Sequence, residues 1–338
     1  QRSQKTVMKS SKSPAMKTAR RRAKKFPEED PGFPSDVVGE SSRKYKVTQG
    51  KYRGKDTVNT LDADSKEYQM KTAWGVEPKK MKFHELSVYQ AIQRAPEDVD
   101  KSRFLALIDT GYDHYCRFFV LELAVYSLEY IGLQKYTTAT VAHVARETLK
   151  ALESLHKIGY IYGTLHPKSI FVGLPPREWK IYLTGFSWAK QIPKDPAKRR
   201  RTRYGAGTDP YASRAQHNDK IVGRSDDLES WFYLVIEMYD VGAQVWQGKR
   251  ESEEVYALKN QLMTKTNESP AKKLLPAPLL SIIIELHLAS SSASPDYESI
   301  HRAIDVLEHM DPRPADSRMV DWFGRVDPKD CKPRFKDC

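Results

Sequence analysis

The pattern of apolar and polar positions divides the chain into an unpatterned beginning and two patterned lobes. Residues 1–40 are rich in Lys, Arg, Ser and Pro and hold almost no periodic apolar residues, which is typical of a disordered basic arm. Residues 41–124 contain short alternations of apolar and polar side chains, as in "KEYQMKTAW" from Lys66, interrupted by Gly50 and Gly54. Such alternation predicts strands, whereas "KFHELSVYQAIQRA" has the apolar spacing of a helix. These residues therefore predict a small lobe of strands with one helix.

A second pair of strands completes the first lobe, and the pattern then becomes helical. The stretch "RFLALIDTGYDHYCRFFVLEL" predicts two strands joined by a turn at residues 110–114. Over residues 125–312 the apolar spacing predicts helices, first in "TATVAHVARETLKALESLHKIGY", where Gly159 is a typical stop signal. "DDLESWFYLVIEM" is apolar on nearly all sides and predicts a buried central helix, and "LLSIIIELHLA" and "YESIHRAIDVLEHM" predict two more.

The two lobes together predict an α+β fold, with a small β-rich N-lobe, a larger α-helical C-lobe and a cleft between them. Ligands commonly bind at such junctions. Residues 313–338 have no regular pattern, and we expect an irregular C-terminal tail anchored on the body by Trp322 and Phe323. The hydrophobic fraction of 39% is sufficient for a packed core in both lobes.

The charge balance bears on the kind of partner. The chain carries 56 Lys and Arg against 44 Asp and Glu, a net charge of +12. This excess favours acidic partners, such as acidic or phosphorylated proteins, nucleic acid or an anionic membrane surface. A solvated basic arm explains the same excess. Within that arm, "ARRRAKK" fits a nuclear-localisation or phosphate-backbone role as well as a merely solvated tail.

The cysteines and the apolar runs bear on the compartment. Cys116, Cys331 and Cys338 lack metal-binding spacing, and an odd number of cysteines does not fit a set of disulfides. A reducing compartment is therefore expected, either cytoplasmic or nuclear. The most apolar run, "LLPAPLLSIIIELHLA", is too short and too polar to span a bilayer, so no membrane partner is expected.

Six short motifs follow one another in order between Tyr45 and Met310: "LESLHKIGYI", "HPKSIF", "YLTGFSWAK", "GTDPYAS", "GRSDDLES" and "PDYESI". In this order and spacing they resemble the protein kinase domain of the casein kinase 1 superfamily, most closely the tau-tubulin kinases. The resemblance implies a bilobal protein-kinase-like fold. It also implies ATP-dependent phosphoryl transfer to serine or threonine on proteins, provided that the residues of the catalytic motifs are present.

The nucleotide-binding residues implied by the resemblance are only partly present. The glycine-rich hairpin corresponds to residues 49–54, where only Gly54 stands at a glycine position. Glycines are needed there because backbone N–H groups must approach phosphate without an intervening Cβ. Lys71 and Glu85 correspond to the lysine and helix glutamate that hold the phosphates. This pair is compatible with phosphate binding and, equally, with a structural ion pair between sheet and helix.

The catalytic residues implied by the resemblance are replaced. The motif H-R-D-x-K-P-x-N corresponds to residues 162–169, with Thr164 in place of the aspartate base and Ser169 in place of the metal-binding asparagine. Gly185 stands where D-F-G has its metal-binding aspartate. A threonine hydroxyl is a poor proton acceptor, and loss of a general base typically costs about 10²–10⁴ in rate. Magnesium is usually held by carboxylates. We therefore expect no catalytic residue, no metal and no cofactor, although ATP binding without magnesium stays open.

Three other residues are considered as replacements for the lost groups. His166, which stands where the family has a lysine, is a candidate base, and Glu178 and Asp209 lie nearby in sequence. Nothing in the sequence brings them to the cleft. By the same resemblance, Asp227 corresponds to a buried helix aspartate that braces the catalytic loop.

A basic segment offers a second candidate site, for anions or partners. Clustered arginines can bind phosphate or carboxylate in a bidentate manner, so the segment is expected either to bind an acidic or phosphorylated protein or to be a solvated run of charge. Pro210 replaces one basic position of the family's anion site. The candidate anion-binding residues are Arg199, Arg200, Arg201, Arg203 and Arg224.

Three functions remain from the sequence. The first is a pseudokinase that binds proteins as a scaffold or regulatory module without phosphoryl transfer. The second is an unconventional ATP-dependent serine/threonine protein kinase, which would depend on Lys71 and Glu85. The third is nucleic-acid binding through the net charge; no aromatic-interleaved basic motif supports it, so it would depend on the basic arm alone.

Overall fold

A computed structural model of the protein describes residues 36–49, 57–63, 66–74, 83–113, 116–124, 126–193, 195, 197, 199, 201, 206–264, 269–288, 294–310 and 320–324. Six of the residues named in the sequence analysis lie outside these ranges: Gly50, Gly54, Arg200, Arg203, Cys331 and Cys338. Most of the expected basic arm, residues 1–35, also lies outside them.

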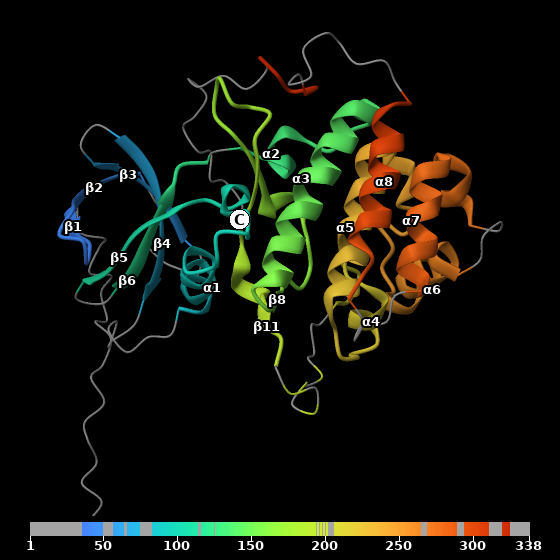
Figure 1. Ribbon diagram of the computed structural model, residues 1–338, viewed down its shortest axis with the longest axis horizontal. Helices are drawn as coiled ribbons and strands as arrows, with labels where there is room; N and C mark the ends of the chain where they lie inside the picture. The colour runs from blue at the N-terminus through green and yellow to red at the C-terminus, as the bar shows by residue number, and fades with distance from the viewer. Residues whose placement is uncertain are drawn as a thin grey trace, which may run out of the picture.

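The N-lobe is one antiparallel six-stranded sheet with the order β1-β2-β3-β4-β6-β5 (Figure 1). Its strands are β1 (Asp36–Val38), β2 (Lys44–Gln49), β3 (Thr57–Ala63), β4 (Lys66–Trp74), β5 (Leu107–Asp113) and β6 (Cys116–Glu122).

Two expectations for this lobe were wrong in their boundaries. β1 lies within the predicted arm, and its buried Val37 pairs with Tyr45 of β2, so the sheet begins before residue 41. The three-residue strand is too short to give a detectable alternation. β5 continues to Asp113, so the predicted turn does not begin at Thr110.

The alternation of side chains along β6 decides which face of the sheet meets the rest of the molecule. Phe118 and Val120 belong to a small outer cluster, whereas Phe119 and Leu121 belong to the main core. This is the two-residue period of a strand. Lys71 of β4 is paired in register with Phe119. It therefore points to the inner face, where helix α1 (His84–Gln93) packs and Tyr89 lies 5.6 Å from the Phe119 ring.

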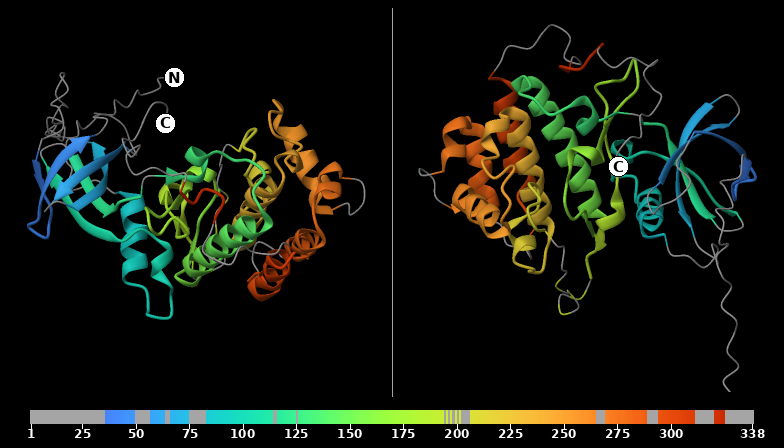
Figure 2. Two further views of the ribbon diagram at one scale, coloured as in Figure 1. Left: turned by 90° about the horizontal axis from the view of Figure 1, so that it is seen from above. Right: turned by 180° about the vertical axis from the view of Figure 1, so that it is seen from behind.

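The C-lobe is built around two long helices, α3 (Thr138–Lys157) and α5 (Arg224–Tyr239), and the second is buried along almost its whole length. The other helices are α2 (Leu128–Ile131), α4 (Arg214–His217), α6 (Ser252–Thr264), α7 (Ala277–Leu288) and α8 (Tyr297–Glu308) (Figure 2). The main predicted helices are confirmed, and Gly159 follows α3 with φ of 84°. In the described ranges no helix has both the length and the apolar character that crossing a membrane requires.

Helix α6 was not among the elements expected from the apolar pattern. Its buried positions are few, and one of them is a lysine: Val255, Lys259, Leu262 and Met263. Because a charged residue at a core position breaks the apolar periodicity, the helix gives no clear amphipathic pattern.

Short elements between the lobes carry the candidate site (Figure 1). These are β7 (Tyr126–Ser127), β8 (Tyr160–Ile161), η3 (Pro167–Ser169), β9 (Ile170–Val172), β10 (Ile181–Leu183), η4 (Phe186–Trp188) and β11 (Lys190–Gln191). β9 and β10 pair antiparallel, and the Thr184 N–H donates to the Ser169 carbonyl at 2.9 Å. This pairing brings residues 162–169 beside residues 184–188.

Residues 320–324 attach the C-terminal segment to the body through Trp322, which is 1% exposed, and not through Phe323, which is 42% exposed. The Trp322 ring packs edge-on against Tyr136 at 5.7 Å, and its Nε1–H donates to the Glu178 carbonyl at 3.1 Å. Asp321 accepts from the Thr137 N–H at 2.7 Å, at the start of α3. The expectation for Trp322 is confirmed and that for Phe323 was wrong.

We expect Trp322→Ala to lower the free energy of unfolding by about 3–5 kcal/mol, because it empties a buried site of aromatic size. Phe323→Ala is the matched control and should change it by less than about 0.5 kcal/mol, as for an exposed side chain. Urea denaturation followed by fluorescence measures both. Equal losses for the two variants would contradict the assignment of Trp322 as the anchor.

Candidate functional site

The lysine and glutamate expected at the nucleotide site lie in direct contact. Lys71 Nζ is 2.6 Å from Glu85 Oε1, and the carboxylate is 1% exposed. Glu85 Oε1 also accepts from the Phe186 N–H at 3.2 Å. The hydroxyl of Ser187 donates to the other oxygen, Oε2, at 3.4 Å. One buried carboxylate therefore connects the sheet, helix α1 and the segment η4.

Aromatic rings continue this connection from α1 into the catalytic-loop region. The Phe186 ring is fully buried and lies 4.9 Å from the Tyr89 ring and 5.9 Å from the Tyr162 ring. Phe104 packs on the same ring at 5.9 Å. Contacts between aromatic rings stabilise by more than their buried area alone, so these rings stabilise the packing of α1 against the loop residues Tyr162 and Phe186.

Asp227 of α5 binds the backbone of the segment that corresponds to the catalytic loop. Its carboxylate accepts from the Tyr162 N–H at 2.5 Å and from the Gly163 N–H at 2.8 Å. It also pairs with His156 Nε2 at 2.8 Å. A buried carboxylate is tolerated when several donors satisfy it. Asp227 therefore has the bracing contacts that the resemblance implies.

Thr164 gives this loop a neutral hydroxyl at the position of the base. Its Oγ1 accepts from Gln216 Nε2 at 2.8 Å, and the residue is half-buried. The next residue, Leu165, is fixed by its N–H, which donates to Ser230 Oγ at 2.8 Å. A hydroxyl held in this way remains a weak proton acceptor.

The position of the metal-binding aspartate is lined by hydroxyl groups. Gly185 has φ of +76°, and a Cβ placed there would lie 3.2 Å from Ser169 Oγ and 3.3 Å from the Tyr162 hydroxyl. Within the described ranges, no group of three or more His, Cys, Asp or Glu could hold a metal ion. Magnesium prefers carboxylate and phosphate oxygens, so the residues present at Gly185 and Ser169 do not fit the magnesium site that the kinase fold implies.

Of the three possible replacements, the structure brings two together. His166 Nε2 lies 3.1 Å from Asp209 Oδ2, and the imidazole packs edge-on against the Tyr211 ring at 5.1 Å. Burial opposes ionisation of Asp209, but the hydrogen bonds from His166 and the Tyr211 N–H, together with nearby positive charge, outweigh it and lower the pKa of that carboxyl. Glu178 is buried elsewhere, and its backbone carbonyl accepts from Trp322 Nε1–H.

The three described arginines of the candidate anion site differ in their environments. Arg201 is exposed, whereas Arg199 is half-buried and its Nε has no hydrogen-bond partner in the described part of the chain. Arg224 begins α5, and its Nη2 is 3.5 Å from the His156 carbonyl. The Pro210 carbonyl accepts from Trp246 Nε1 at 2.9 Å. The backbone at Pro210 is therefore attached to the C-lobe.

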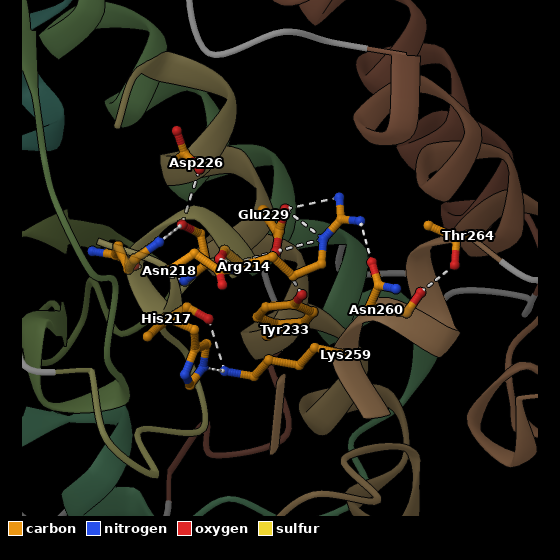
Figure 3. Close-up of polar contacts among 12 residues, drawn as sticks. Arg214, His217, Asn218, Asp226, Glu229, Tyr233, Lys259, Asn260 and Thr264 are labelled. Carbon is orange, nitrogen blue, oxygen red and sulfur yellow. Dashed lines mark hydrogen bonds and ion pairs between the residues drawn. The ribbon is translucent and has the colours of Figure 1, made fainter. Parts of the chain in front are cut away.

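A buried lysine that the sequence did not indicate fixes the segment at residues 207–213. Lys259 is fully buried, and its Nζ donates to the Asp209 carbonyl at 2.8 Å and to the Ala212 carbonyl at 2.7 Å. It also lies 3.1 Å from His217 Nε2 and 4.9 Å from the centre of the Tyr233 ring (Figure 3). A single lysine in a polar helix gives no sign of burial in sequence, which is why it was missed.

An ion pair continues this attachment into the next helix. Arg214 Nε lies 3.1 Å from Glu229 Oε1, and the Tyr233 hydroxyl donates to the same carboxylate at 2.7 Å (Figure 3). Arg214 Nη1 also contacts Asn260 of α6 at 3.3 Å. The segment that follows the cleft is therefore bound to α5 and α6 by contacts that need no ligand.

Comparisons with known proteins agree with this fold. No protein-family model matches the chain. It is 30% identical over 213 residues to "Putative serine/threonine-protein kinase ZK507.1" of Caenorhabditis elegans, a match that covers 60% of this chain and 63% of that protein. It is 27% identical over 212 residues to casein kinase I homolog 3 of Schizosaccharomyces pombe, covering 58% of this chain and 47% of the homolog. The chain thus corresponds to part of each relative's length.

A solved structure described as "Structure of vaccinia related kinase 3" superposes with a TM-score of 0.67. The superposition covers 85% of this chain and 95% of the other. Because the sequence identity is 18%, the match shows a shared fold and nothing about function. The predicted bilobal kinase-like fold is confirmed. The protein is a protein-kinase-like domain related to casein kinase 1 homologues and to other serine/threonine kinases.

Lys259 makes stability depend on pH. Burial lowers the pKa of its ammonium group from 10.5 to about 7. Between these two values the unfolded chain binds the extra proton, so the free energy of unfolding rises with pH. Relative to Lys259→Met, we expect the wild type to gain stability from pH 7 to pH 10, by at most about 1.4 kcal/mol per pH unit. Urea denaturation across this range measures the difference, and parallel curves for the two proteins would contradict it.

Proposed function

We propose that the protein is a pseudokinase of the casein kinase 1 type, nearest to the tau-tubulin kinases, that binds proteins as a scaffold or regulatory module. The observation that carries this proposal is the chemistry at positions 164 and 185. Thr164 provides only a neutral hydroxyl that is bound to Gln216, and Gly185 provides no side chain. Phosphoryl transfer by this fold needs a carboxylate at each place.

The contacts that hold the site together are retained, so the replacements are confined to the positions of the base and of the metal-binding residues. The Lys71–Glu85 pair, the Asp227 contacts and the aromatic stack on Phe186 all remain. A chain under no constraint to fold would not keep both buried polar arrangements satisfied, because each unsatisfied buried group costs about 1–3 kcal/mol. A retained fold with neutral residues at the positions of the metal-binding aspartate and the base supports a role in binding.

The partner that we propose is an acidic or phosphorylated protein. Arg201 is exposed, and Arg199 is half-buried two positions before it. Guanidinium groups of this kind form strong, charge-assisted hydrogen bonds to carboxylate and phosphate. We place the protein in the cytoplasm or the nucleus and propose neither a membrane nor a nucleic-acid partner outside the basic arm. ATP, if bound, would contact Lys71 without magnesium.

A second candidate function is an unconventional serine/threonine kinase. The observation in its favour is the contact between His166 and Asp209, which orients an imidazole two residues from Thr164. A positioned imidazole is the commonest general base in enzymes. Lys71 would then hold the phosphates of the nucleotide.

The expected result of a phosphoryl-transfer assay is no incorporation of labelled phosphate into casein or into the protein itself, with ATP and either Mg²⁺ or Mn²⁺. In the same preparation, the melting temperature in the presence of ATP should be the same with Mg²⁺ as with EDTA. Lys71→Met is the control for contaminating kinases. Transfer that is abolished by both Lys71→Met and His166→Ala would contradict the proposal and support the second candidate.

Binding to an acidic phosphoserine peptide, followed by fluorescence anisotropy, tests the partner surface. Arg199→Ala combined with Arg201→Ala should weaken binding about tenfold, since a hydrogen bond to a charged group contributes about 1.5–3 kcal/mol. Arg177→Ala removes another exposed arginine, in the loop between β9 and β10, and serves as the matched control. An equal effect of Arg177→Ala, or no binding at low salt, would count against this surface.

A further inference from the structure

The side chain of Gln69 is bound to the backbone at the point where the chain leaves the N-lobe. Gln69 of β4 is 5% exposed, and its Nε2 donates to the Glu122 carbonyl at 3.0 Å. Glu122 is the last residue of β6, and its N–H donates to the Ala106 carbonyl at 2.9 Å. A buried side-chain amide therefore occupies the carbonyl that begins the connection between the two lobes.

Gln69 lies on the same face of the sheet as Lys71. Residues two positions apart on a strand share a face and are separated by about 6.6 Å. Gln69 is paired in register with Leu121 and Lys71 with Phe119, and both of these partners belong to the main core. Along this inner face, Gln69 therefore lies between the Lys71 ammonium group and the connection that begins at Glu122.

The protein itself fills the space on the other side of Lys71. There Glu85 of α1 binds the ammonium group and is 1% exposed. Behind Glu85, the fully buried Phe186 ring packs on Tyr89 at 4.9 Å. By the resemblance, Lys71 corresponds to the lysine that holds the phosphates of a nucleotide. The base of a nucleotide bound in this way would therefore be directed toward Gln69.

The hydrogen bond of Gln69 is of the kind that an adenine base makes. Binding sites for small molecules fix the orientation of their ligands with a few polar groups, among them backbone N–H and C=O groups. The exocyclic amino group of adenine is an N–H₂ donor, and the carboxamide of Gln69 presents the same donor to the Glu122 carbonyl. A base that displaced Gln69 would leave this buried amide without its partner, which is unfavourable.

We propose that Gln69 excludes purine nucleotides from the face that carries Lys71, because its side chain takes both the space and the hydrogen-bond acceptor that an adenine base needs. This inference rests on the proposed pseudokinase function and deepens it. The protein then lacks binding of the nucleotide as well as the base and the metal ligands. The consequence is that a small side chain at position 69 opens this face to adenine, whereas a long apolar side chain keeps it closed.

Titration calorimetry with ADP in EDTA tests the proposal, and pyrophosphate serves as the probe for phosphate contacts alone. The wild type should bind ADP no more tightly than pyrophosphate. Gln69→Ala should bind ADP at least about tenfold more tightly than the wild type does, which is about 1.4 kcal/mol, with pyrophosphate binding unchanged. No gain for ADP, or an equal gain for pyrophosphate, would overturn the proposal.

Two control variants separate the space that Gln69 fills from a general loosening of the protein. Gln69→Met keeps the length of the side chain and should bind ADP no better than the wild type. Gln244 is a buried glutamine of the C-lobe, 3% exposed, whose Nε2 donates to the Tyr233 carbonyl at 2.9 Å. Gln244→Ala should leave ADP binding unchanged. A gain in either control as large as that in Gln69→Ala would refute the proposal.

The wild type alone also decides the question, whether or not Gln69→Ala folds. If the wild type binds ADP more tightly than pyrophosphate, the adenine base has a site and the proposal is wrong. Such binding without phosphate transfer would leave the proposed function intact. Phosphate transfer by the wild type would refute the proposed function as well, so the two failures can be told apart.

Discussion

Asp227 is a buried carboxylate on the central helix of the C-lobe, and the shape of the cleft depends on it. It accepts two backbone N–H groups from the loop at Tyr162 and Gly163 and pairs with His156. These contacts hold the loop from inside the protein, where water does not compete. Glu85 does the same from the opposite side through Lys71 and Phe186. Two buried carboxylates therefore hold the loop at residues 162–163 and the segment that begins at Phe186.

Within this fixed frame, neutral groups stand where phosphoryl transfer needs charge. Thr164, Ser169 and Tyr162 present hydroxyls, and Gly185 presents none of its own. Hydroxyls satisfy buried carbonyls well but bind divalent cations weakly compared with carboxylates. The proposed loss of magnesium binding follows from this difference in ligand chemistry. The segment beyond it is fixed separately by Lys259 and by the ion pair of Arg214 with Glu229.

The fold could be predicted from the sequence because its long elements have clear periods. The buried helix α5 and the strand β6 gave unambiguous patterns, and the six motifs fixed their order. Helix α6 was missed because Lys259 interrupts its apolar side. β1 was missed because three residues are too few to show an alternation.

The sequence could predict which residues occupy the candidate site, but not the contacts among them. The replacements at positions 164, 169 and 185 can be seen in the sequence, but the contact of the Tyr162 hydroxyl with Thr184 cannot, because it depends on the distance between two loops. The measurement that tests the account most directly is anomalous scattering from crystals of the wild type grown with ATP and Mn²⁺. The account predicts no Mn²⁺ bound to protein oxygens in the cleft. A manganese ion held by side-chain carboxylates beside Lys71 would contradict it.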